Sequence, residues 1–101
     1  MRGAVITEPT VLPLRGELCI AELPDVRALI EAAITAGAVA LTIDLAEVTL
    51  LTAGALRVFA TTEARLAAQG GALRLQNPLP LARRVLEIAG FDRLVEPSLP
   101  V

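Results

Sequence analysis

Few side chains in this 101-residue chain are capable of chemistry, and they are scattered. Cys19 is the single thiol, so neither an internal disulfide nor a cysteine-based metal cluster is available. Asp44 and Glu47 are paired carboxylates, the residue types of glycoside hydrolysis, but nothing nearby supplies a nucleophile or a metal. Thr52 stands between an apolar run and an amphipathic segment, where a hydroxyl can cap a helix. These residues predict no catalytic site.

The composition argues against several classes of function. Histidine is absent, which removes the commonest general base and metal ligand. The two aromatic residues, Phe59 and Phe91, are too few to stack the bases of single-stranded nucleic acid. All nine basic residues are scattered arginines, and the net charge is −2, so no basic stripe indicates DNA or RNA. We expect a protein that is not an enzyme, needs no cofactor or metal and binds no nucleic acid.

The apolar segments are too short to cross a bilayer, because Asp44 and Glu47 interrupt the best candidate. The first ten residues, "MRGAVITEPT", lack the apolar run of a signal peptide. We therefore expect a cytoplasmic protein without direct membrane insertion.

The elements that position these residues follow from hydrophobic periodicity. Alternation predicts strands, and a stripe at i, i+3, i+4 and i+7 predicts helices. Arg15-Gly16 indicates a bend between early strands, and Pro13 indicates a strand at a sheet edge. Asn77 is a candidate N-cap for the last helix, with Pro78 at its first position. The expected strands are 4–6, 10–20, 39–45 and 72–76; the expected helices are 23–37, 53–69 and 78–90; and 91–96 forms a last turn or strand.

This order predicts an α/β domain. Strands joined through helices require right-handed crossovers and a largely parallel stretch of sheet, while the first two strands are candidates for an antiparallel hairpin. We expect one domain over residues 1–101, with a core from about 11 to 95 and a frayed tail at 96–101.

The chain resembles the STAS domain family, which is named after sulfate transporters and anti-sigma factor antagonists. The resemblance lies in the order and spacing of four segments across most of the chain: "LRGELCI", "LTIDLAEVTLL", "AAQGGALRLQNP" and "ARRVLEIAGFDRLV". It implies a mixed central sheet of four to five strands with three to four helices mainly on one face. It also implies a non-enzymatic module that docks onto other proteins.

Family members carry an Asp-Ser-Ser/Thr-Gly turn at the start of the second helix, and an anti-sigma kinase phosphorylates the third residue. An ungapped alignment places Thr52, Ala53, Gly54 and Ala55 on this turn, so Gly54 occupies the phosphoacceptor position without a hydroxyl. Shifting the alignment by one residue matches "TAG" to the Asp-Thr-Ala-Gly turn of STAS subunits in a bacterial lipid-transport ABC system. Thr52 is an alternative phosphosite, although helix capping is the favoured interpretation. Family members commonly have Asp where Cys19 stands.

The resemblance implies two alternative functions. The first is an anti-sigma factor antagonist that binds an anti-sigma factor or serine kinase in a partner-switching pathway and lacks the usual phosphoacceptor. The second is an accessory subunit that contacts the ATPase of an ABC lipid transporter. A homodimer through an exposed strand edge is a further expectation. The expected partner-binding residues are Cys19, Thr52, Ala53, Gly54, Ala55 and Arg57.

Overall fold

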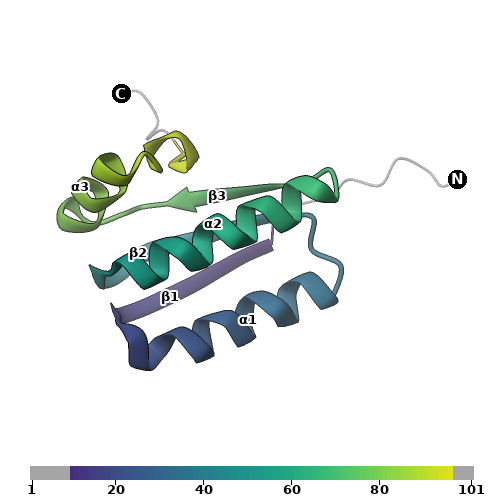
Figure 1. The fold of residues 1–101 in the computed structure, drawn as a ribbon, viewed down its shortest axis with the longest axis horizontal. Helices are drawn as coiled ribbons and strands as arrows, with labels where there is room; N and C mark the ends of the chain where they lie inside the picture. Colours follow the sequence, from purple (N-terminus) through teal and green to yellow (C-terminus); the bar gives the residue numbers. More distant parts are fainter. Residues whose placement is uncertain (1–9, 97–101) are drawn as a thin grey trace, which may run out of the picture.

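The computed structural model describes residues 10–96, and these residues form a three-stranded sheet with three α-helices (Figure 1). Two short 3₁₀ helices, η1 and η2, precede the first α-helix and follow the last one. The elements in chain order are β1 (Thr10–Leu18), η1 (Ile20–Glu22), α1 (Leu23–Thr35), β2 (Ala40–Leu51), α2 (Ala53–Ala68), β3 (Ala72–Gln76), α3 (Pro80–Ala89) and η2 (Asp92–Leu94).

The sheet has the order β1-β2-β3, and both strand pairs are parallel. Each parallel pair is joined through a helix on the covered face, as a parallel connection requires. In the sheet formed by the described residues, β2 lies in the centre and β1 lies at one edge, where Pro13 predicts it. The inward side chains of β2, Leu41 and Ile43, are completely buried and lie beside Leu73 and Leu75 of β3. These aliphatic side chains form the centre of the core.

β2 is longer than its alternating pattern suggests. Its pairing with β1 shifts by one residue after Asp44 and again after Val48, so β2 carries an extra residue at each point. Such bulges change which side chains face the core. Leu45, Val48 and Leu51 are therefore buried at intervals of three instead of two. The bulges extend the strand as far as the turn that begins α2.

The helices α1 and α2 run side by side and cover the same face of the sheet (Figure 1). Pro24 lies in the first turn of α1. α2 contributes Phe59 and Leu66 to the core, both completely buried. α3 packs against β2 beyond the carboxyl end of β3 and buries Ala82 and Leu86.

Two expectations about the elements require correction, and a third is tested only in part. β1 continues through Arg15-Gly16 as one strand, because Gly16 adopts a positive φ of 80° without ending the pairing. Asn77 is not the N-cap of α3, since Leu79 occupies that position and the helix begins at Pro80. Asn77 has a positive φ of 57°, and its side-chain amide donates to Asp44 Oδ1 at 3.5 Å. The expected sheet of four to five strands has three strands among the described residues, and the expected strand at 4–6 lies outside them.

The last turn of the described chain is held against α2 by an ion pair. Arg93 of η2 donates from both terminal nitrogens to the carboxylate of Glu63, at 2.6 and 3.0 Å. These hydrogen bonds lower the pKa of Glu63 below its ordinary value. The Glu96 amide then donates to the Leu75 carbonyl at 2.8 Å, so residues 95–96 follow the outer edge of β3.

Candidate functional site

The turn between β2 and α2 lies beside the end of β1. Because the two strands are parallel and paired up to Leu18 and Leu51, their carboxyl ends meet at the same edge of the sheet. Cys19 leaves β1 at this edge and Thr52 leaves β2 there. Open sheets of α/β proteins commonly place binding sites at this edge. The sheet topology therefore brings together two regions that are separated in the sequence.

Thr52 joins the two strand ends through its hydroxyl. The hydroxyl donates to the Leu18 carbonyl oxygen at 2.7 Å and accepts from the Ala55 amide at 3.4 Å. The second contact makes Thr52 the N-cap of α2. The Thr52 hydroxyl therefore has two structural roles: it binds the end of β1 and it caps α2.

Gly54 is overlaid by the first residue of α1. A Cβ atom placed at position 54 would lie 2.7 Å from Leu23 Cδ1, closer than real Cβ contacts. Leu23 is itself buried. The space that a serine side chain would need at this turn is therefore occupied by the tip of a leucine. A larger residue at position 54 requires that tip to move.

An open hollow of about 620 Å³ lies over this turn. Five of the six residues expected to bind a partner line it, namely Cys19, Thr52, Ala53, Gly54 and Arg57. Ala55 differs, because its side chain is completely buried beneath the turn and reaches no surface. Four further residues line the hollow without having been singled out from the sequence: Ile20, Ala21, Leu23 and Arg27. These apolar and basic residues form no recognisable motif in the sequence, because only folding brings η1 and α1 beside the turn.

Cys19 is a half-buried free thiol at the rim of the hollow. Its pKa is raised above the ordinary value, first by burial and then by the carboxylates of Glu17 and Glu22. The thiol is therefore protonated at neutral pH, and it is a poor nucleophile. Cys19 contributes a small polarizable surface, as expected for a cysteine in an apolar strand.

The two carboxylates considered for catalysis have separate structural partners. Asp44 Oδ1 accepts from the Ala46 amide at 2.9 Å, whereas Glu47 pairs with Arg15 at 3.1 Å across the sheet surface. Within residues 10–96, no three His, Cys, Asp or Glu side chains are grouped closely enough to hold a metal ion. No helix in the described part of the chain is both long and apolar enough to cross a membrane.

The fold and the site together define a small α/β domain with an open hollow at the carboxyl edge of its sheet. The family model described as "Mlab, STAS domain" matches residues 6–96 of the sequence. The chain belongs to the STAS domain family. None of the curated proteins compared with it gives a significant match.

Solved structures of anti-sigma factor antagonists are similar to this chain. Unphosphorylated SpoIIAA is 25% identical with a TM-score of 0.79, covering 95% of this chain and 84% of its own. The phosphorylated form of SpoIIAA, a Bacillus cell fate determinant, is 25% identical with a TM-score of 0.71, covering 95% and 87%. An anti-sigma factor antagonist from Mycobacterium paratuberculosis is 26% identical with a TM-score of 0.77, covering 88% and 77%. These similarities support a regulatory role of the STAS type.

Proposed function

We propose that the chain is a non-enzymatic docking module that binds an anti-sigma factor or its serine kinase through the hollow at the β2–α2 turn. The similarity to anti-sigma factor antagonists supports this class of partner. The exposed Ala53 has only a methyl group and the half-buried Gly54 has no side chain, so the backbone of a partner can approach the start of α2 closely.

The observation that carries the proposal is that the space beside Gly54 is already filled by another side chain. Position 54 has no hydroxyl, and Leu23 Cδ1 fills the space where a side chain would stand. Thr52, the nearest hydroxyl, already donates to Leu18. A phosphate on Thr52 would break that hydrogen bond. The docking surface is therefore built without the acceptor that switches related proteins, and we propose that its binding is not controlled by phosphorylation of the turn.

Binding measurements on a matched pair of variants test this proposal. Ala53 is exposed at the first position of α2, so Ala53→Glu places a charge on the docking surface without disturbing the core. A carboxylate near a helix N-terminus is also compatible with the helix dipole. Ala64→Glu adds the same charge at another exposed position of α2 and serves as the control.

The titration partners are purified anti-sigma factor kinases from the source organism. We expect the wild type and Ala64→Glu to bind one of them, and Ala53→Glu to bind it about tenfold to a hundredfold more weakly, because a charge is buried without a partner. Equal binding by Ala53→Glu would place the interface elsewhere. A chain that binds no kinase would contradict the proposed class of partner.

A second candidate function is that of an accessory subunit on the ATPase of an ABC lipid transporter. Two observations favour it. The matching family model is described as Mlab, which is not the description of an anti-sigma factor antagonist. The shifted alignment also gives the Thr52-Ala53-Gly54 sequence of the transporter-type turn. Including a purified transporter ATPase in the same titrations distinguishes the two functions, since each predicts a different binding partner for the same hollow.

A further inference from the structure

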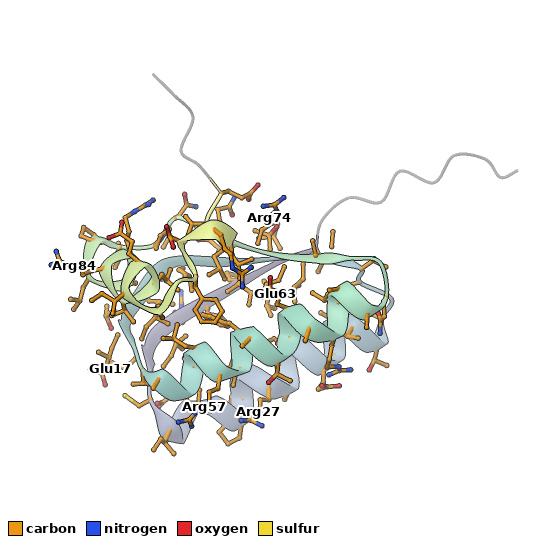
Figure 2. All side chains as sticks on the ribbon, turned by 45° about the horizontal axis from the view of Figure 1, so that its top comes forward. Glu17, Arg27, Arg57, Glu63, Arg74 and Arg84 are labelled. Carbon is orange, nitrogen blue, oxygen red and sulfur yellow. The ribbon has the colours of Figure 1, made fainter. Side chains whose placement is uncertain are left out.

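Two arginines without acidic partners border the hollow. Arg27 comes from α1 and Arg57 from α2, and Figure 2 shows them close together along the same side of the helix pair. Three other arginines of the described chain, Arg15, Arg65 and Arg93, each form an ion pair with a glutamate. Within residues 10–96, Arg27 and Arg57 have no such pair and no hydrogen bond to another side chain. Both guanidinium groups are exposed and available to an incoming group.

The lining of the hollow between these arginines and Cys19 is apolar. Ile20 is 81% exposed, the largest exposed fraction of any large hydrophobic residue in the described chain. Ala21, Leu23 and Ala53 continue the same surface. An apolar patch bordered by polar residues is the usual arrangement of a protein-binding surface, in which an apolar centre is buried and charges form the rim. This lining is therefore suited to bury an apolar side chain of a partner.

The charge around the hollow is unequal. The two arginines lie on the α1–α2 side, and the N-terminus of α2 adds a partial positive charge there. Glu17 and Glu22 lie on the Cys19 side, where both raise the pKa of the thiol. The surface therefore has a positive side and a negative side, which fixes the orientation of a charged partner.

We propose that the hollow receives an acidic segment of a partner protein, in which an apolar side chain stands beside Asp or Glu residues. The apolar side chain covers Ile20 and Leu23, and the carboxylates pair with Arg27 and Arg57. Guanidinium groups bind carboxylates with well-aligned, charge-assisted hydrogen bonds, which favours this partner chemistry. This inference rests on the proposed docking function and specifies the chemistry of the partner surface.

A charge-reversal pair tests the inference. Arg27→Glu combined with Arg57→Glu reverses the positive side of the hollow. Arg74→Glu combined with Arg84→Glu makes the same change in net charge at exposed positions of β3 and α3, which Figure 2 shows well away from the hollow. The probes are two synthetic peptides, one with a leucine between glutamates and one with lysines in place of those glutamates. Binding is located by the NMR shifts of backbone amides.

We expect the acidic peptide to bind the wild type at least about tenfold more tightly than the basic peptide, with the largest shifts at Ile20, Arg27 and Arg57. The Arg74/Arg84 control retains this preference, and the Arg27/Arg57 variant loses or reverses it. Raising the salt concentration weakens the binding of the acidic peptide to the wild type more than its binding to the Arg27/Arg57 variant. The inference is overturned if neither peptide binds, if both bind equally, if the basic peptide is preferred, or if the shifts centre elsewhere.

The peptide result is independent of the identity of the biological partner. If the acidic peptide binds the hollow but no anti-sigma factor kinase binds the chain, the inference holds and the proposed partner class fails. If a kinase binds the wild type and the Arg27/Arg57 variant equally, the docking function holds and the inference fails.

Discussion

Thr52 is the residue on which the geometry of the site depends. Its hydroxyl bonds the Leu18 carbonyl at the end of β1 and the Ala55 amide in the first turn of α2. One side chain therefore links the end of β1 to the first turn of α2. A valine, which has the same shape but no hydroxyl, would provide neither bond.

Replacing Thr52 measures this contribution. We expect Thr52→Ala to lower the free energy of unfolding by about 1–2 kcal/mol, toward the upper end of the range for lost N-caps, because the Leu18 carbonyl also loses its donor. Thr52→Ser keeps the hydroxyl and is expected to retain most of the stability. Urea denaturation followed by circular dichroism gives both values. If Thr52→Ala and Thr52→Ser were equally stable, the hydroxyl would have no structural role.

The residues of the site were predictable from the sequence only in part. The family turn indicates positions 52–55, because its spacing from the following segments is ungapped. The turn does not show that Ala55 points inward, since a small apolar residue suits either the surface or the core. Ile20 and Arg27 were not predicted because their relation to the turn depends on how η1 and α1 pack beside β2.

The elements were predicted well where hydrophobic periodicity is uninterrupted. The expected strand at 72–76 has the observed bounds of β3, and the expected helix at 53–69 ends one residue after α2. The second half of β2 was missed because two bulges shift its alternation. The start of α3 was misplaced because the "NPLP" segment contains two prolines, Pro78 and Pro80, and either suits a first helical turn. Local propensity does not choose between them.

The junction between α2 and β3 contains the closest backbone approach to a glycine in the described chain. A Cβ atom at Gly71 would lie 1.9 Å from the Val39 carbonyl oxygen, the same oxygen that accepts from the Ala72 amide. The preceding residue, Gly70, has a positive φ of 79° but open space around it. The two glycines are therefore required for different physical reasons.

Alanine substitutions separate these two reasons. We expect Gly71→Ala to lower the free energy of unfolding by about 3 kcal/mol, because the backbone of residue 39 must move and the first pairing of β2 with β3 is disturbed. Gly70→Ala, which only forces an alanine into the left-handed region, is expected to cost about 1 kcal/mol. Thermal and urea unfolding provide the comparison. If the Gly71→Ala protein were as stable as the Gly70→Ala protein, the backbone at the start of β3 could move at little cost in free energy.

At the level of the whole molecule, we propose a docking protein in which the expected phosphoacceptor position, residue 54, is a glycine. If the proposed partner is a serine kinase, adding ATP to the complex tests whether phosphorylation controls binding. For SpoIIAA, both an unphosphorylated and a phosphorylated form have been solved.

Restoring the acceptor tests this difference. We expect the wild type to remain bound to an anti-sigma factor kinase in the presence of ATP and to gain no phosphate. Gly54→Ser is expected to gain one phosphate and dissociate, since the flexible tip of Leu23 can turn aside to admit the serine. Intact-mass spectrometry and gel filtration of the mixture follow both events, with Gly54→Ala, which adds a Cβ atom but no hydroxyl, as the control. Phosphate found on Thr52 of the wild type would show that the turn has an acceptor after all.

The parallel arrangement of all three strands determines how the described chain folds. A helix separates each pair of neighbouring strands along the sequence. No pair of these strands can therefore form early as a β-hairpin. The first strand pair forms only after a loop that contains all of α1 has closed, and loop closure of this kind slows folding. β1 and α1 are made first during synthesis, but their apolar faces stay uncovered until β2 emerges. We therefore expect folding to be delayed until the middle of the chain is complete, with β2 as the strand on which both neighbours assemble.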